Sequence, residues 1–275
     1  MAHKIVSHDE WVAAREQHLA EEKEFTKARD RLSQARRELP WELVDKEYVF
    51  EGANGRRTLG QLFDGRNQLV IYHAMFNPDT AGPNTTWTKT EPCFACSWWM
   101  DNFDRMAVHL NHHDVTIAAA AYAPYEVFEA YRARVSWSFP VYSSRGSDFN
   151  FDYHVSFTPE QVKAGRAEYN YRVDPVSGSE APGLSVFLRD SDRIYHTYSA
   201  YARGLDMLNV GYHYFDIVPK GRDEGDGNMH WLAAGMSTPP DGSRSSRLSP
   251  SYSGCAAEIV ATNARTPAVM CTPAH

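Results

Sequence analysis

The stretch EPCFACSWWMDNFD, residues 91–104, decides the fold class of this chain. It places Cys93 and Cys96 two positions apart in C-x-x-C spacing, directly ahead of an apolar and aromatic run. That run predicts a helix from about Phe94 to Leu110. Three interpretations of the cysteine pair are open: a redox dithiol, half of a zinc site, or two thiols that only pack in a core.

Two apolar segments flank this helix. QLVIYHAMF, residues 68–76, and VTIAAAAYA, residues 115–123, are near-continuous apolar runs, which are typical of strands buried on both faces. The polar segment NPDTAGPNTTWTKTEP, residues 77–92, is long enough to be a functional lid or an insertion. A C-x-x-C pair near a strand–helix–strand pattern is typical of a thioredoxin-like redox site.

The remaining elements continue the alternation of strands and helices. A helix is predicted from Pro124 to about Ser136, two strands over 183–190 and 193–201, and a helix over 203–217. This order implies a central mixed sheet with helices on both faces. We therefore predict an α/β, thioredoxin-like fold preceded by a long N-terminal helix.

Composition divides the chain into three parts. Residues 1–40 predict an amphipathic helix that begins with a capping box of Ser7 and Glu10. Its apolar stripe, which packs on the domain or on a second subunit, comprises Phe25, Ala28, Leu32, Ala35 and Leu39. Residues 41–220 form the thioredoxin-like domain, and residues 221–275 are a Gly-, Ser- and Pro-rich tail that we expect to be largely disordered.

Charge and hydropathy exclude several classes of protein. The chain of 275 residues has a net charge of −7, and no run of Lys or Arg exceeds two residues, which argues against nucleic-acid or anionic-membrane binding. The apolar runs are too short to cross a bilayer, and the first residues lack the apolar region of a signal peptide. We expect a cytoplasmic protein.

The position of the cysteine pair predicts its chemistry. At the start of a helix, free backbone amides stabilise a thiolate over a thiol. Cys93 is therefore the predicted nucleophile, and Cys96, one helical turn further on, is the predicted resolving thiol of a mixed disulfide.

A zinc site is the main chemical alternative, and it lacks ligands. Structural zinc takes four ligands, but Cys255 and Cys271 supply no second C-x-x-C. The histidines of HLNHHD, of which the first is His109, lie at the far end of the predicted helix, roughly 20 Å from the pair at about 1.5 Å per residue. We predict no metal.

Taken together, the motifs resemble a bacterial family of unknown function that is classed as thioredoxin-like and labelled as predicted dithiol-disulfide oxidoreductases. The matching stretches span roughly residues 7–224 and include HDEWVAAR, LFDGR, QLVIYHAMF, CFACSWWMDNFD, GSDFNFDYHVSFTPE and PGLSVFLRD. The resemblance implies a thioredoxin-like fold and places the family's cysteine pair at Cys93 and Cys96.

This chain departs from the family pattern at two places. The loop at residues 80–91 is longer than expected. After MHWL, residues 229–232, a basic and aromatic ending is expected, but AAGMSTPPDGSRSS follows. One hypothesis is a shifted reading frame beyond Leu232, which would leave the cysteines of the tail without function.

Four residues are predicted to border the substrate groove. Pro182 precedes a predicted strand, where thioredoxin-like proteins carry a cis-proline against the dithiol; a trans proline that begins the strand is the alternative. Trp98 follows the pair, and Arg203 could steer an anionic substrate or cap structure. Thr90 stands three residues before Cys93, as in the peroxiredoxin pattern P-x-x-x-T-x-x-C, although Thr86 replaces the proline of that pattern.

These residues predict a thiol–disulfide oxidoreductase that acts on a protein or small-molecule disulfide. It needs no cofactor, only an electron donor or acceptor that resets the dithiol. Two alternatives are a peroxiredoxin-like thiol peroxidase and a non-catalytic binding module. A binding module has no reason to lower the pKa of Cys93 below the free-thiol value of about 8.5.

Overall fold

The computed structural model describes residues 3–224, 229 and 232. The chain divides into two compact units, Met1–Trp41 and Glu42–His275. The predicted disordered tail lies outside the described residues, apart from residues 221–224 and two isolated positions. No helix within the described part of the chain is long and apolar enough to cross a membrane.

The first unit consists of the helix α1, His8–Arg37. The predicted capping box is present: the Glu10 amide donates to the Ser7 hydroxyl at 3.3 Å, and the Ser7 amide donates to the Glu10 carboxylate at 3.0 Å. Within α1, which is described in full, no residue is buried. Its apolar side chains are exposed, with Phe25 at 69% and Leu32 at 60%.

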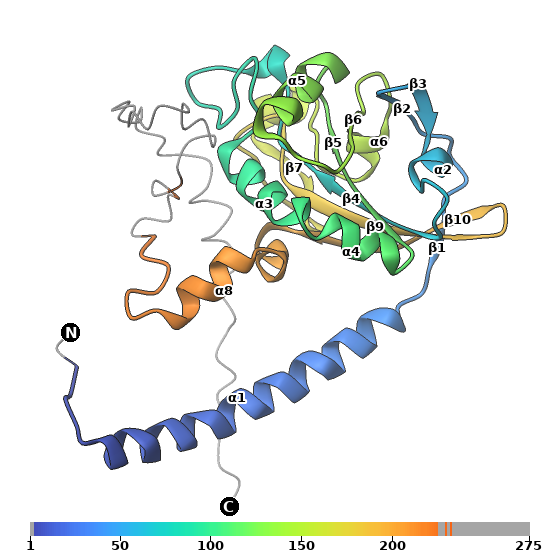
Figure 1. Ribbon diagram of the computed structural model, residues 1–275. Helices are drawn as coiled ribbons and strands as arrows, with labels where there is room; N and C mark the ends of the chain where they lie inside the picture. The colour runs from blue at the N-terminus through green and yellow to red at the C-terminus, as the bar shows by residue number, and fades with distance from the viewer. Residues whose placement is uncertain (1–2, 225–228, 230–231, 233–275) are drawn as a thin grey trace, which may run out of the picture. The chain divides into compact units, whose positions relative to one another are not determined.

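The second unit is built on a sheet whose described strands number eight, in the order β1-β10-β9-β4-β5-β6-β2-β3 (Figure 1). These strands are β1 (Glu42–Leu43), β2 (Val49–Gly52), β3 (Gly55–Thr58), β4 (Gln68–His73), β5 (Val115–Ala121), β6 (Val141–Ser143), β9 (Gly183–Asp190) and β10 (Arg193–Tyr201). The predicted strands over 68–76, 115–123, 183–190 and 193–201 are all present.

The connections define the fold class. β4 pairs parallel with β5 and antiparallel with β9, and β9 pairs antiparallel with β10. The helices of this frame are α3 (Phe94–Asp104) between β4 and β5, α5 (Tyr125–Val135) after β5, and α8 (Val210–Ile217) after β10. A βαβ unit followed by a ββα unit, with the strands side by side in the order β5-β4-β9-β10, is the thioredoxin-like frame, as predicted.

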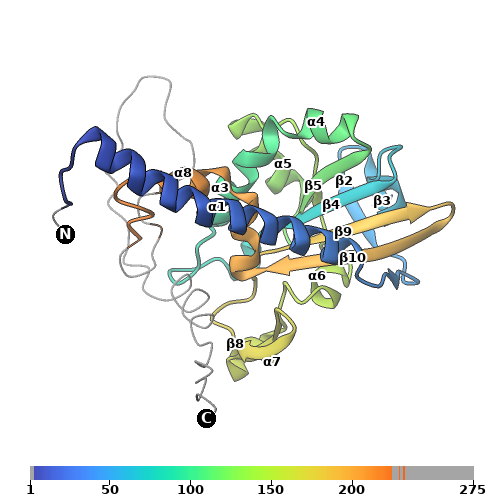
Figure 2. The ribbon, with the colours of Figure 1, turned by 90° about the horizontal axis from the view of Figure 1, so that it is seen from below.

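Side-chain alternation along the strands divides the core into two layers. Tyr72 faces the layer filled by α3, α5 and α8, whereas Leu69 and Ile71 face the layer beneath the short helices α2 (Leu59–Leu62) and α6 (Phe149–Asp152). Figure 2 shows α3, α4 (Ala107–His112) and α5 on one side of the strands and α6 on the other. The predicted arrangement of helices on both faces is therefore confirmed.

Two predicted helices are interrupted. α3 ends at Asp104, where Ser138 supplies hydrogen bonds to the last residue. The Ser138 amide donates to the Asp104 carboxylate, and the Ser138 hydroxyl donates to the Asp104 carbonyl. The predicted helix over 203–217 divides into the 3-10 helix η2 (Ala202–Leu208) and α8, whose cap Asn209 accepts a hydrogen bond from the Gly211 amide. The second interruption depends on local capping and the first on a contact with a distant segment, and apolar spacing predicts neither.

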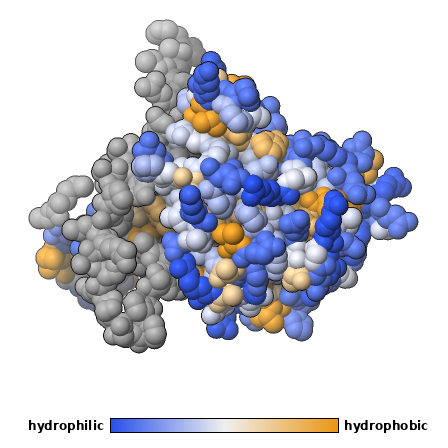
Figure 3. Space-filling model, turned by 90° about the horizontal axis from the view of Figure 1, so that it is seen from above, coloured by the Kyte–Doolittle hydropathy of each residue, from blue (hydrophilic) through white to orange (hydrophobic). Residues whose placement is uncertain are grey.

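Several short elements do not follow from the sequence patterns. They are η1 (Pro78–Thr80), β6, α6, α7 (Pro159–Ala164) and the separate hairpin of β7 (Arg166–Tyr169) and β8 (Arg172–Pro175). The hairpin turn holds Asn170 and Tyr171 at positive φ, 54° and 64°, which suits a tight two-residue turn. The surface shown in Figure 3 is mostly hydrophilic, with hydrophobic residues in small separate groups.

Candidate active site

Both thiols lie where β4 ends and α3 begins. Cys93 is the N-cap residue of α3, and its amide donates to the Met75 carbonyl at 2.9 Å. The Met75 amide in turn donates to the Cys96 sulfur at 3.4 Å. These two bonds fasten the dithiol to the chain leaving β4. Both cysteines are free thiols, with exposed fractions of 3% and 2%.

The two thiols ionise at different pH values. The hydrogen bond from the Cys96 thiol lowers the pKa of Cys93 to about 7, against an opposing effect of burial. The Thr86 hydroxyl and the backbone amides of Ala95 and Cys96 lower it further. Burial and the neighbouring Cys93 thiolate raise the pKa of Cys96 well above its ordinary value. Cys93 is therefore the more acidic thiol.

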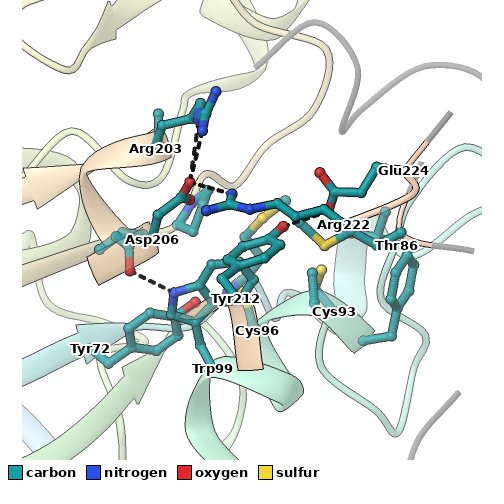
Figure 4. Close-up of a pocket in the computed structure, with 17 residues that line it drawn as sticks. Tyr72, Thr86, Cys93, Cys96, Trp99, Arg203, Asp206, Tyr212, Arg222 and Glu224 are labelled. Atoms are coloured by element: carbon teal, nitrogen blue, oxygen red, sulfur yellow. Dashed lines mark hydrogen bonds and ion pairs between the residues drawn. The ribbon is translucent and has the colours of Figure 1, made fainter. Parts of the chain in front are cut away.

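A cavity of about 220 Å³ opens beside the dithiol (Figure 4). Most of its lining is apolar, including Tyr72, Met75, Trp99, Pro182, Leu205 and Met229. The wall across from α3 comes from η2, α8 and the residues that follow them. A reacting atom next to Cys93 would thus lie in mainly apolar surroundings.

Polar side chains of the C-terminal segment meet across this cavity. Arg222 pairs with Asp206 at 2.8 Å and lies over the Tyr212 ring at 3.9 Å from its centroid. The Tyr212 hydroxyl donates to Glu224 at 2.8 Å, and Arg203 pairs with Asp206 at 3.2 Å. Figure 4 shows Arg203 and Arg222 converging on Asp206. The charged groups that border the cavity therefore neutralise one another.

Two of the predicted groove residues lie at the cavity, but the peptide bond before one of them differs from the predicted conformation. Pro182 and Arg203 both line it. No peptide bond within residues 3–224 is cis, so the prediction of a cis bond before Pro182 is wrong. The trans bond leads directly into β9, and the Pro182 carbonyl accepts a hydrogen bond from the Tyr169 hydroxyl at 2.7 Å.

The other two predicted groove residues lie elsewhere. Trp98 packs edge-on against Tyr212, with 4.9 Å between ring centroids, and its neighbour Trp99 lines the cavity instead. Thr90 is exposed, in a turn where its amide and that of Glu91 donate to the Thr88 hydroxyl. That turn holds Thr90 away from the cavity lining.

Thr86 occupies the position beside Cys93 that was expected for Thr90. Its hydroxyl oxygen is buried and has no standard hydrogen bond within the described residues, although its proximity lowers the pKa of Cys93. The only sequence signal for Thr86 was its place in the proline position of the peroxiredoxin pattern. Its neighbour Trp87, buried and bonded to the Asn77 carbonyl at 2.9 Å, holds this part of the loop inward.

The described residues contain no group of three or more His, Cys, Asp and Glu side chains placed to hold a metal ion. His109, His112 and His113 are all exposed on or next to α4, away from the cavity lining. The expectation of a metal-free protein stays a prediction.

Fold and site define a thioredoxin-like protein with a buried C-x-x-C dithiol beside a mainly apolar cavity. The sequence model of the family DUF899, described as bacterial proteins of unknown function, matches residues 1–236. The chain belongs to this family. The resemblance found in the sequence motifs is thereby confirmed. A comparison with curated proteins finds no match.

Among solved structures, the chain is similar to the following three proteins, all of low sequence identity. The Xanthomonas campestris bacterioferritin comigratory protein, described with alkyl peroxide reduction activity, is 10% identical, with 62% of this chain and 95% of that chain covered and a TM-score of 0.36. Mycobacterium tuberculosis peroxidoxin BcpB is 11% identical, with 62% and 94% covered and a TM-score of 0.35. The Plasmodium falciparum mitochondrial 2-Cys peroxiredoxin is 8% identical, with 64% and 93% covered and a TM-score of 0.36.

Proposed function

We propose that this chain is a thiol–disulfide oxidoreductase in which Cys93 is the nucleophile and Cys96 is the resolving thiol. The observation that carries the proposal is the position of two adjacent buried thiols at the start of α3, with Cys93 as its N-cap, beside the cavity. Their unequal ionisation supports it. A Cys93 pKa of about 7 provides a substantial fraction of thiolate at neutral pH. A purely structural pair has no need of this difference.

The reaction proceeds in two exchanges. The Cys93 thiolate attacks one sulfur of a substrate disulfide, forms a mixed disulfide and releases the first substrate thiolate. Cys96 then loses its proton, attacks the Cys93 sulfur and releases the second substrate thiolate, which leaves a Cys93–Cys96 disulfide. The substrate gains two electrons, and a dithiol donor returns them to the protein. The Tyr72 hydroxyl and the Met75 amide, which favour the Cys96 thiolate, assist the second exchange.

Single-cysteine variants test this assignment. With dithiothreitol as electron donor, Cys93→Ser should abolish the protein-dependent part of the reduction of a small disulfide such as bis(2-hydroxyethyl) disulfide, after the direct reaction of free dithiothreitol is subtracted. Cys96→Ser treated with the disulfide alone, without dithiothreitol, should instead accumulate the mixed disulfide on Cys93. Mass spectrometry of the Cys93 peptide detects it separately from adducts on Cys255 and Cys271. Ser97→Ala, next to the pair, serves as a control that keeps both thiols. Equal turnover by the two cysteine variants would contradict the assigned roles.

A thiol peroxidase is the second candidate, favoured by the enclosed cavity and the Thr86 hydroxyl beside Cys93. In that reaction the Cys93 thiolate attacks a hydroperoxide oxygen, releases an alcohol and becomes a sulfenic acid. Cys96 condenses with it to a disulfide and releases water. Consumption of cumene hydroperoxide much faster than of any disulfide would favour this candidate.

The remaining proposals concern the setting of the protein. We propose a homodimer through the apolar stripe of α1. Phe25 and Leu32 are exposed, and each lies three or four residues from the next apolar position of the stripe. Cytoplasmic localisation is proposed on the free state of both cysteines, which suits a reducing compartment.

A further inference from the structure

We infer that the substrate of this dithiol is a low-molecular-weight, uncharged disulfide and not a disulfide of a folded protein. This inference rests on the proposed thiol–disulfide exchange. It concerns which disulfides can reach Cys93, a question that the two thiols alone do not answer.

Burial of the nucleophile limits the size of the substrate. A thiolate that exchanges with protein disulfides must meet a sulfur carried on a bulky chain, yet Cys93 is only 3% exposed. The cavity at Cys93 has a volume of about 220 Å³. That is below the range of roughly 300–1,000 Å³ for pockets that hold drug-sized ligands. The cavity is partly open, and a disulfide must enter it to reach Cys93. A small disulfide can enter as a whole, whereas a folded protein would have to insert the segment that carries its disulfide.

The wall that encloses the cavity is attached closely to α3. The Trp99 indole donates to the Leu205 carbonyl at 3.0 Å, and the Val210 amide donates to the Asn102 side chain at 3.0 Å. At Gly211 a Cβ atom would lie 2.4 Å from the Trp98 ring, so only glycine permits this approach of α8. The wall is therefore held against α3 and narrows the approach to Cys93. We call this restriction the size filter.

The charges around the cavity favour a neutral substrate. Of the residues that line it, Arg203 and Arg222 are cationic, and Asp206 and Glu224 are anionic. Arg222 also pairs with Asp216 at 2.7 Å, and both lining arginines pair with Asp206. The four lining charges sum to zero, since Asp216 lies outside the lining. An ionic substrate would lose its hydration without gaining a net opposite charge from the lining, while an apolar substrate loses little.

A panel of disulfides tests the inference on the full-length reduced protein. The rate of Cys93–Cys96 disulfide formation is measured with bis(2-hydroxyethyl) disulfide, anionic dithiodiglycolate, cationic cystamine and insulin. Each rate is divided by that of free dithiothreitol with the same disulfide, which removes differences in intrinsic reactivity. After this division, we expect the neutral compound to exceed each ion by about tenfold and insulin by about a hundredfold, since restricted access lowers association rates.

A glycine pair separates the size filter from general damage. Gly211→Ala should move α8 away from Trp98 and raise the normalised insulin rate by about tenfold relative to the neutral compound. Gly204→Ala is the matched control, because its Cβ would meet only Ala200 at 3.5 Å, an ordinary contact. If Gly211→Ala does not fold, the wild-type panel still decides.

The outcomes distinguish the two levels of the proposal. A normalised insulin rate equal to that of the neutral compound in the wild-type protein overturns the size filter and leaves the oxidoreductase function standing. Preference for either ionic disulfide overturns the assignment of an uncharged substrate. Failure of every disulfide to oxidise the Cys93–Cys96 pair overturns the proposed function together with this inference.

Discussion

At the scale of single residues, the reactivity of Cys93 depends on groups from separate parts of the chain. Cys96 and the amides of the first turn of α3 are close in sequence, but Thr86 reaches the thiol from the loop before the helix. The Thr86 hydroxyl is buried without a standard hydrogen-bond partner in the described residues. Its effect is on the Cys93 sulfur, whose pKa it lowers. We therefore propose Thr86 as a positioning residue for the Cys93 thiolate.

Thr86→Val should raise the pKa of Cys93. The variant keeps the shape of the side chain and removes the hydroxyl, and a hydrogen bond to a charged group is worth about 1.5–3 kcal/mol, or roughly one to two pKa units. Alkylation of the thiol by iodoacetamide as a function of pH measures the shift in the Cys96→Ser background. The control is Thr90→Val, since Thr90 is exposed and does not line the cavity. An equal pKa in both valine variants would remove Thr86 from the site.

At the scale of elements, the loop that carries Thr86 is tied to the start of β9 by a buried carboxyl group. Glu180 is 4% exposed and accepts hydrogen bonds from Asn77 at 3.1 Å and Ser156 at 2.6 Å. The Asn77 carbonyl accepts the Trp87 indole, next to Thr86. Burial raises the pKa of Glu180 to about 8, against the lowering effect of those two bonds.

This buried carboxyl group should make stability fall as pH rises. Its pKa is raised on folding from 4.5 to about 8, so the folded state binds the extra proton between these values. The stabilisation is complete below pH 4.5 and is lost as pH rises to about 8. Relative to Glu180→Gln, the wild-type protein should lose on the order of a few kcal/mol of unfolding free energy across this interval.

Urea unfolding on both sides of the interval measures the difference between wild type and Glu180→Gln. The glutamine side chain of the variant is neutral at every pH and has nearly the same shape as glutamate. Glu51→Gln provides the control, because Glu51 is exposed on β2. A parallel pH dependence in wild type and Glu180→Gln would show that Glu180 is ionised in the folded protein throughout.

At the scale of the whole molecule, α1 forms a compact unit apart from the thioredoxin-like unit. Its stripe repeats at three- and four-residue steps, the spacing of a helix that pairs with another helix. Exposed apolar residues arranged in such a row indicate an interaction surface, unlike the small separate groups on the face in Figure 3.

Charge placed in the stripe should dissociate the proposed homodimer. The double variant Phe25→Asp/Leu32→Asp should shift the mass in sedimentation equilibrium from dimer toward monomer, because burying two carboxylates in an apolar seam is costly. Its Cys93 alkylation rate should be unchanged. Lys23→Asp controls for charge, as it lies two positions from Phe25 and thus about 200° away around the helix. A wild-type protein that sediments as a monomer contradicts the proposal.

Local patterns in the sequence were sufficient for the frame of the molecule. The apolar runs before and after the cysteine pair predicted β4 and β5, and Ser7 with Glu10 predicted the start of α1. These features depend on neighbours in the chain, since a few consecutive residues are enough to indicate a buried strand or a helix cap.

The cavity and the side chains that line it depend on contacts between distant segments. Ser138 ends α3, Thr86 and not Thr90 faces Cys93, and Trp99 and not Trp98 lines the cavity. The ion pairs of Arg222 likewise join residues of η2 and α8 with the chain beyond them. Spacing along one segment holds no record of which side chain a remote segment will bring against it, so these features appeared only when the packed sheet and its helices brought those segments together.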